Sequence, residues 1–410
     1  MNDGPDRAAG TPPAALLDEA RAILPDIVAV RRRLHRVPEV GLHLPLTQAI
    51  VIEELERLGL VARRGRDVSS VVAAIDGSRS GPTVLLRADM DGLPVGEDTG
   101  LPFASEHAGV MHACGHDTHV AMLLGGVRLL LARRDELAGR VLLMFQPGEE
   151  GWHGARFMLD EGLLDSAGAP GPTRSFALHI STRYPTGTVN LRSGAMLAAS
   201  DTLAIEVHGR GGHASTPHLA VDPVAIAAEI LLALQVMITR QVHAFEPAVI
   251  TVTRIDAGTA TNIIPELASL HGTIRTTSET TRAVVLERIH QVADGIAAAH
   301  GATAETRIEP GYPITLNDPS STAIVRALAV GLLGPDAVQE MDNPVMGAED
   351  FSYVLQRVPG CFAFLGARPR DVDPATAPQT HSNRVVFDEA VLADGAALHA
   401  EVARDFLARA

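Results

Sequence analysis

Lysine is absent from the 410-residue sequence, so arginine supplies all 34 of its Lys-or-Arg positions. Without lysine the chain cannot form a lysine Schiff base, anchor pyridoxal phosphate or use the lysine of a P-loop. Aromatic residues make up only 3% of the chain, and the formal net charge is −15. An acidic chain with few aromatic rings predicts that the protein binds neither nucleic acid nor an anionic membrane.

Cysteine is also scarce, because Cys114 and Cys361 are the only two. Two cysteines cannot build a disulfide network, and a reducing compartment is the simpler interpretation. Residues 1–12 are polar and include acidic side chains, so we expect a loose tail there and not a signal peptide. No uncharged apolar run reaches about 18 residues, so no membrane span is expected. These features predict a cytoplasmic protein.

Hydrophobic residues make up 46% of the chain and the mean hydropathy is +0.14, which suits two or more domains with large cores. Along the first half, predicted strands and helices alternate, which indicates an α/β core with helices on both faces of a sheet. The expected helices cover residues 14–36 with a kink at Pro25, 47–58, 118–132 and 154–160; the expected strands cover 70–75, 83–87, 140–145 and 175–180.

The pattern changes at about Gly194. Predicted elements then follow in the order βαββαβ, which is typical of a ferredoxin-like sandwich of about 100 residues. A helix expected over residues 320–333 resumes the first domain. We therefore expect one domain over residues 1–193 and 311–410, interrupted by an inserted domain over residues 194–310.

Polar side chains gather where the predicted strands of the first domain end. Asp89 and Asp91 follow one strand, Glu149 and Glu150 follow another, and His179 lies at the end of a third. Open α/β sheets place their sites at the carboxyl ends of strands, so these side chains are expected to lie together.

The adjacent glutamates, Glu149 and Glu150, suit hydrolysis at a pair of metal ions. Such a site needs several ligands and one carboxylate left free to deprotonate water. Neighbouring side chains point in different directions, so one glutamate could hold metal while the other faces the substrate. The alternative is a solvated pair of loop charges. A serine hydrolase is disfavoured, because the sequence contains no G-x-S-x-G.

The segment MHACGHDTH, residues 111–119, combines a cysteine with three histidines. Cys114 and His116 have a spacing that could hold one metal ion, although a lone cysteine is more often a buried small hydrophobe. A thiolate favours zinc, whereas imidazole and carboxylate ligands also admit manganese, cobalt or nickel.

A glycine-lined histidine, His213, lies in the segment GRGGHASTPH, residues 209–218. The glycines imitate a dinucleotide-binding fingerprint, but Pro217 stands where a helix should begin, so that interpretation fails. His213 is better interpreted as a donor to a developing oxyanion, with an exposed turn histidine as the alternative.

Eight motifs, in order, resemble those of peptidase family M20, in particular its amidohydrolase branch of hippurate hydrolases, N-acyl-amino-acid hydrolases and auxin-conjugate hydrolases. The resemblance extends from about residue 30 to about residue 406. Its motifs are RADMDGLP (87–94), MHACGHDTH (111–119), FQPGEEG (145–151), GRGGHASTPH (209–218), GTATNIIP (258–265), GTIRT (272–276), GAEDFSY (347–353) and the segment around His381.

The resemblance implies a zinc-peptidase-like catalytic domain with a mixed sheet and an inserted ferredoxin-like lid domain, which often dimerises. It implies two divalent metal ions, zinc, manganese, nickel or cobalt, and a general base that later donates its proton, Glu149. The metal ligands that it implies are Cys114, His116, Glu150, His179 and His381. Asp91 would support the metal site.

The resemblance also implies roles for residues of the lid. His213 would stabilise the oxyanion, reaching the site of the opposite subunit of a homodimer. Asn262 and Arg275 would contact the substrate, and the planar guanidinium of Arg275 suits a substrate carboxylate. An ordinary strand-surface arginine is the alternative for Arg275. Glu349 and Asp350 are assigned only to the neighbourhood of the site.

The predicted activity is hydrolysis of the amide bond of an N-acyl amino acid or a related small linear amide, giving a carboxylic acid and an amine. Two alternatives stay open: a dipeptidase or carboxypeptidase whose substrate has a free amine, and a catalytically silent binding protein on the same fold. Ser181, Thr182, Arg183 and Tyr184 depart from the family pattern after His179, as does His153, so the preferred acyl group is left open.

Overall fold

The chain of the computed structural model divides into two compact units. Residues 13–168 and 171–409 are described, so the tail expected over residues 1–12 lies outside the described residues. The first unit comprises Met1–Gly194, Leu316–Asp342 and Tyr353–Ala410, and the second comprises Ala195–Thr315 and Asn343–Ser352. The second unit therefore interrupts the first, and residues 343–352, which we expected in the first domain, group with the second.

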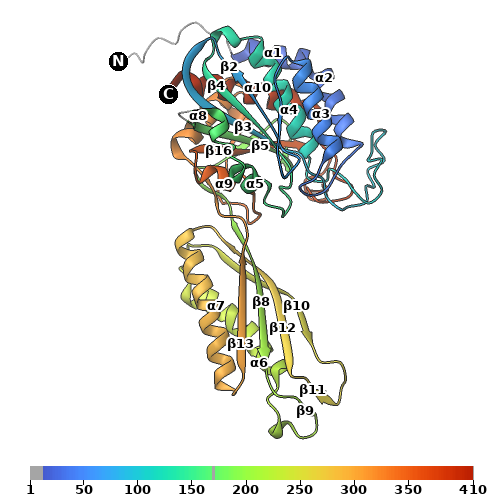
Figure 1. Cartoon of the computed structure of the whole chain (residues 1–410), viewed down its shortest axis with the longest axis vertical. Coiled ribbons are helices and arrows are strands. Elements are labelled where there is room, and N and C mark those ends of the chain that lie inside the picture. The colour runs from blue at the N-terminus through green and yellow to red at the C-terminus, as the bar shows by residue number, and fades with distance from the viewer. Residues whose placement is uncertain (1–12, 169–170, 410) are drawn as a thin grey trace. The chain divides into compact units, whose positions relative to one another are not determined.

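An eight-stranded mixed sheet forms the centre of the first unit, with the order β1-β2-β4-β3-β5-β16-β6-β15 (Figure 1). Its strands are β1 Arg63–Arg64, β2 Val71–Asp76, β3 Arg79–Asp89, β4 Ala138–Gln146, β5 Pro172–Pro185, β6 Val189–Leu191, β15 Val338–Glu340 and β16 Gly360–Arg368. The neighbouring strands β4, β3, β5 and β16 are parallel. Their carboxyl ends therefore meet at one edge of the sheet, as an α/β fold requires.

Two long helices, α4 (His116–Leu131) and α10 (Leu392–Arg409), pack against each other and against β3 (Figure 1). The segment predicted as one kinked helix is two helices, α1 (Pro13–Ala22) and α2 (Leu24–His35). Pro25 lies in the first turn of α2, where its missing N–H leaves no bond unmade. The remaining described α-helices of this unit are α3 (Pro45–Arg57), α5 (Gly154–Asp160), α8 (Pro319–Leu333) and most of the short α9 (Ser352–Leu355).

The second unit contains the βαββαβ order that the sequence predicts. Its four-stranded sheet has the order β10-β12-β8-β13, and every neighbouring pair is antiparallel. The elements are β8 Ala199–His208, α6 Pro223–Gln241, β10 Ala248–Ala257, β12 Leu267–Thr276, α7 Glu279–Ala299 and β13 Thr303–Pro310. The helices α6 and α7 pack against each other and against this sheet (Figure 1). This arrangement confirms the ferredoxin-like insertion.

The helix α6 is the one described helix that is long and apolar enough to cross a membrane, by length and composition only. One stripe of it is buried in the core of the second unit, including Ile226, Ile230 and Leu234. A core helix of this kind passes the same test, so α6 is weak support for a membrane span.

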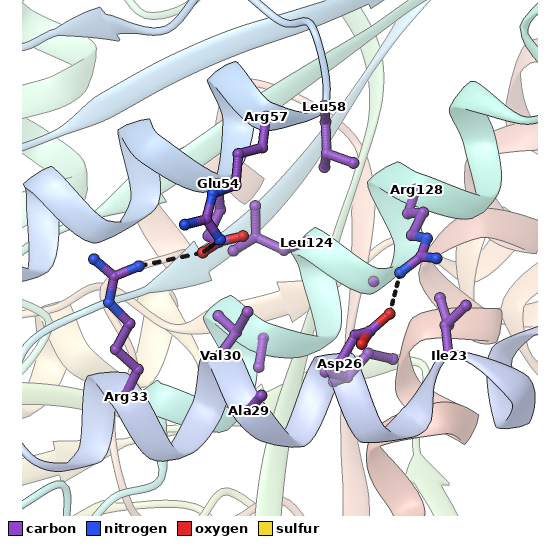
Figure 2. A pocket seen from close by; sticks show the side chains of 13 residues that line it. Ile23, Asp26, Ala29, Val30, Arg33, Glu54, Arg57, Leu58, Leu124 and Arg128 are labelled. Atoms are coloured by element: carbon purple, nitrogen blue, oxygen red, sulfur yellow. Dashed lines mark hydrogen bonds and ion pairs between the residues drawn. The ribbon is translucent and has the colours of Figure 1, made fainter.

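A hollow of about 550 Å³ lies between α2, α3 and α4 of the first unit (Figure 2). Its lining is mainly apolar and includes Leu124, and ion pairs such as Asp26–Arg128 lie along its sides. None of the predicted ligands or catalytic residues lines it. The chemistry is therefore sought at the carboxyl edge of the sheet.

Candidate metal centre and active site

The parallel strands bring predicted site residues of the first unit to one level of the sheet. Asp89, the last residue of β3, pairs in register with Gln146, the last residue of β4. Arg87 pairs with Ala177 of β5, so His179, two residues further on, stands level with Asp89. The strand β5 continues beyond His179, which therefore lies within a strand and not at its end as predicted.

The buried carboxylate of Asp91 holds the two adjacent glutamates. Its two oxygens accept hydrogen bonds from the backbone N–H groups of Glu149, at 2.9 Å, and of Glu150, at 3.0 Å. The same carboxylate lies 3.3 Å from Nδ1 of His116. One side chain therefore orients a histidine ring and the turn that carries both glutamates.

The segment Cys114–Gly115–His116 leads into α4, which begins at His116. Gly115 has φ +85°, a left-handed conformation that favours glycine. A methyl group on Gly115 would lie 2.5 Å from Ile180 and 3.0 Å from Phe387, so a larger residue does not fit. The glycine places the cysteine and the histidine on either side of a sharp turn.

Side chains that can bind metal converge at this turn. Three overlapping sets each bring their ligand atoms within 4.8 Å of one another: Cys114, His116 and His179; Cys114, Glu150 and His381; and His116, Glu149 and Glu150. The structure therefore brings together all five predicted ligands and the predicted base. Both ring nitrogens of His116 are buried without a hydrogen-bond partner in the part of the chain that the structure describes, and Nε2 lies 3.4 Å from a carboxylate oxygen of Asp89. A ring nitrogen that is buried and not hydrogen-bonded fits a metal ligand.

His381 comes to the cluster from the loop before α10. It has φ +72°, which is uncommon outside glycine and is found most often at functional sites. Its backbone N–H donates to the carbonyl of Ala113 at 2.9 Å, and its Nε2 lies 3.1 Å from Oε1 of Glu150. This loop is therefore tied to the segment that carries Cys114.

The pKa values of the predicted metal ligands indicate which of them already have the protonation state that binds metal. Burial and the neighbouring His119 hold the pKa of His179 well below its usual range, so its imidazole is neutral. Burial acts to raise the pKa of Glu150, but the hydrogen bond from His381 together with the charges of His116 and His381 outweighs burial and lowers that pKa. Neutral imidazole and ionised carboxylate are the forms that coordinate metal.

Cys114 and His116 keep their protons in the absence of a cation. Burial raises the pKa of the Cys114 thiol well above its usual range, and the carboxylates of Glu150 and Glu149 raise it further. Burial lowers the pKa of His116, but nearby carboxylates, Asp89 foremost, outweigh burial and raise it to about 10. A metal ion inverts this preference, because a coordinated thiol loses its proton.

Two buried side chains, His119 and Arg87, contact Asp89, and neither of them was assigned a role from the sequence. One oxygen of Asp89 lies 2.5 Å from Nδ1 of His119, and the other accepts a hydrogen bond from Arg87 at 2.8 Å. Nε2 of His119 accepts a hydrogen bond from the backbone N–H of Ile180, the residue after His179. The spacing of His116 and His119 on one helix, beside an aspartate at a strand end, was the available signal.

His153, which departs from the family pattern, lies beside the glutamate turn. It has φ +58° at the start of α5, and its Nδ1 lies 3.0 Å from the hydroxyl of Tyr353. A left-handed non-glycine residue beside the cluster suggests a functional constraint.

Other predicted site residues lie in the second unit. His213 and Asn262 line one shallow hollow of about 460 Å³ and are exposed; the N–H of Ala214 donates to the carbonyl of Asn262 at 3.1 Å. Arg275, on β12, is half-buried and is absent from the lining of this hollow. Glu349 and Asp350 belong to this unit and are buried. The structure thus brings His213 and Asn262 together.

A buried set of thiol, imidazole and carboxylate ligands, with a further carboxylate beside it at the carboxyl edge of an α/β sheet, defines a metal-dependent hydrolase. The sequence profile of peptidase family M20/M25/M40 matches residues 85–405, and the chain belongs to this family.

Named relatives cover most of the chain. Thermostable carboxypeptidase 1 of Saccharolobus solfataricus is 40% identical over 95% of this chain and 98% of its own length. N-acetyl-L-cysteine deacetylase of Bacillus subtilis is 38% identical over 83% of this chain and 80% of its own length. The crystal structure of the YXEP protein of Bacillus subtilis, a dinuclear metal binding peptidase from the M20 family, has a TM-score of 0.82 and 33% identity, covering 95% of this chain and 100% of that one. These findings confirm the prediction of a metal-dependent amidohydrolase of the M20 family.

Proposed function

We propose that this protein hydrolyses the linear amide bond of N-acyl amino acids, with two divalent metal ions and with Glu149 as general base. The products would be a carboxylic acid and an amino acid. The observation that carries the proposal is the shared anchoring of Glu149 and Glu150 by Asp91. This anchoring would hold Glu150 among the ligands and Glu149 beside them.

Cys114, His116, Glu150, His179 and His381 would hold the metal ions, with zinc, manganese, nickel or cobalt as candidates. The name of the Bacillus subtilis structure, a dinuclear metal binding peptidase, supports two ions. Divalent ions bound here would lower the pKa of water and polarise the amide carbonyl.

Glu149 would do the proton chemistry. Its carboxylate would take a proton from the attacking water and then give that proton to the leaving nitrogen, so that no net proton is consumed. Burial of Glu149, which is 5% exposed, keeps bulk water from competing for that proton. Asp91 would act by holding the glutamate turn in place.

The lid residues would complete the site from a second subunit. His213 would donate to the developing oxyanion of the opposite subunit in a homodimer, and Asn262 and Arg275 would hold the substrate. An exposed histidine and asparagine in one hollow support a role that needs a partner surface. We also propose that the enzyme is cytoplasmic.

A peptidase that acts on substrates with a free amine is the second candidate. The name of the Saccharolobus solfataricus relative, a carboxypeptidase, supports the peptidase part of this candidate but not the free amine. The two candidates differ in one group on the substrate. N-Acetyl- and N-benzoyl-amino acids should be hydrolysed faster than dipeptides with a free amine if the first candidate holds. The reverse order would establish the second.

The decisive experiment compares Glu149→Gln with Glu150→Gln. Glu149→Gln should abolish turnover while its metal content, measured by inductively coupled plasma mass spectrometry, equals that of the wild type. Glu150→Gln should lose both turnover and metal. Normal turnover by Glu149→Gln would overturn the proposed base. A wild-type protein that binds metal but hydrolyses no amide would instead be a silent binding protein.

A further inference from the structure

Two buried side chains of α2 contact the first turn of α4. Nε of Arg31 lies 2.7 Å from Oδ2 of Asp117, and Nδ1 of His35 lies 2.8 Å from the same oxygen. Arg31 and His35 are each 1% exposed, and Asp117 is 0% exposed. A contact of this kind, removed from water, is much less screened than a surface ion pair.

This cluster extends on both sides of Asp117. Nε2 of His35 lies 3.2 Å from the carboxylate of Glu97, which belongs to the connection between β3 and α4. Arg31 also donates to Glu389, just before α10, at 3.0 Å. The cluster therefore joins α2 to the connection that carries Cys114 and to the C-terminal part of the unit.

The ring of Phe103, in the connection between β3 and α4, packs against the same two side chains of α2. It lies 4.7 Å from the guanidinium carbon of Arg31 and packs edge-on against His35, with 5.5 Å between ring centres. The positions of both side chains are thus set by packing as well as by charge.

Asp117 immediately follows His116, so the contacts that fix Asp117 to α2 also restrain the segment proposed to bind metal. The segment Cys114–Gly115–His116 turns at a glycine in a left-handed conformation, and glycine has no side chain to hold the turn. One end of the segment is held where Ala113 accepts the N–H of His381. The other end is held where Asp117 meets α2.

We propose that Arg31 and His35 are positioning residues that, through Asp117, set the geometry and the metal affinity of the Cys114–His116 segment. They act through Asp117 and touch neither substrate nor metal. The inference rests on the proposed metal site. The family profile matches residues 85–405, a range that includes neither Arg31 nor His35.

The test uses the full-length protein, freed of metal and titrated with Co²⁺ or Zn²⁺ against a chelating indicator. The variants are Asp117→Asn, His35→Gln and the double variant. The matched control is Asp26→Asn, which removes a solvent-exposed ion pair between the same two helices, Asp26–Arg128 (Figure 2). Thermal unfolding of each metal-free protein reports separately on folding.

Asp117→Asn should weaken the tighter metal site by about tenfold or more, as loss of a group that orients a ligand does. It should also change the visible absorption spectrum of the Co²⁺-loaded protein. Asp26→Asn should change metal affinity by less than about twofold, because exposed ion pairs contribute little. The double variant should be no weaker than the worse single variant, since His35 acts through Asp117.

A folded Asp117→Asn or His35→Gln protein with wild-type Co²⁺ affinity and spectrum would overturn the inference. So would an equal loss of affinity in Asp26→Asn, or additive losses in the double variant. If Asp117→Asn fails to fold, His35→Gln decides by the same two measurements. A wild-type protein that binds no metal would instead refute the proposed function, on which this inference depends.

Discussion

At the scale of single residues, the carboxylate of Asp91 arranges three members of the site at once. It accepts hydrogen bonds from the backbone N–H groups of Glu149 and Glu150, and it lies beside the ring of His116. An amide at this position would turn an NH₂ group toward one of these donors. Asp91→Asn should therefore lower kcat/KM about 10–100-fold and weaken metal binding, while the fold is kept.

Steady-state kinetics and metal titration check this expectation. Asp98→Asn is the control, because Asp98 lies on the same connection with its side chain 70% exposed. Equal activity in the Asp91→Asn and Asp98→Asn proteins would show that Asp91 does not organise the site.

A second residue-scale prediction concerns His399, which is 0% exposed in α10. Burial, and then the charge of His119, lower its pKa to about 3, whereas the unfolded chain should titrate near 6.5. Between these two pKa values, His399 is protonated in the unfolded state but not in the folded state. The free energy of unfolding should therefore fall as the pH falls below about 6.5, by up to about 1.4 kcal/mol per pH unit.

His399→Leu removes this titration, so its stability relative to the wild type should rise steadily as the pH is lowered. Urea unfolding at several pH values, followed by the fluorescence of Trp152, measures this difference in the first unit. A difference that stays constant between about pH 7.5 and pH 5 would contradict the lowered pKa.

Residue types at strand ends predicted that Glu149, Glu150 and His179 lie together, because the parallel strands align those ends. The full ligand set, which adds Cys114, His116 and His381, came from the resemblance to the M20 family. The contact by which Arg31 anchors Asp117 could not be predicted from the sequence. The two residues lie far apart in the chain, and a buried arginine has no sequence pattern of its own. The hydrogen bond between His119 and Asp89 was not predicted, although the spacing of His116 and His119 on one helix offered a signal for it.

At the scale of elements, two glycines in helices allow the effect of packing on stability to be distinguished from the effect of helix propensity. A methyl group on Gly125 of α4 would lie 2.7 Å from Cδ1 of Ile27 and 2.9 Å from Cβ of Ala396, whereas one on Gly295 of α7 would meet nothing within 4 Å. Gly295→Ala should stabilise its unit by about 0.8 kcal/mol, and Gly125→Ala should destabilise its unit by about 1–3 kcal/mol.

Hydrogen exchange of the α4 and α7 amides, with calorimetry of the whole protein, measures both effects. Each variant serves as the control for the other, since both make the same chemical change in a helix. Stabilisation by Gly125→Ala would mean that α2 and α10 leave more room at α4 than their contacts indicate.

The elements that were predicted correctly have a clear local pattern. The strands β2, β3 and β4 are short apolar runs between turn residues, and the βαββαβ order of the second unit follows from periodicity. The strand β16 was missed although its residues Gly360–Ala367 are all buried, because a continuous apolar run does not distinguish a strand from a buried helix. The break between α1 and α2 depends on one proline, whose position in a first turn is set by tertiary packing.

At the scale of the whole molecule, the proposed site residues are divided between two units, and the chain passes from the first unit into the second twice. The metal cluster lies entirely in the first unit, and His213 lies in the second. Large hydrophobic side chains are exposed along α6 of the second unit, with Leu232 at 65% and Val236 at 60% exposure. These side chains support association through the second unit, which the proposed action of His213 on the opposite subunit requires.

Mixed dimers test that action. Glu149→Gln and His213→Ala should each be inactive or nearly so alone. A dimer containing one of each has one site with both an intact Glu149 and an intact His213, provided that the histidine comes from the partner. Doubly tagged mixed dimers should then recover about half of the wild-type activity per dimer, since one of two sites works. Pairing Glu149→Gln with the Glu149→Gln/His213→Ala double variant leaves no intact site and should recover none. If the histidine acts within its own subunit, the first mixture stays as inactive as its parents, because neither subunit then holds both residues.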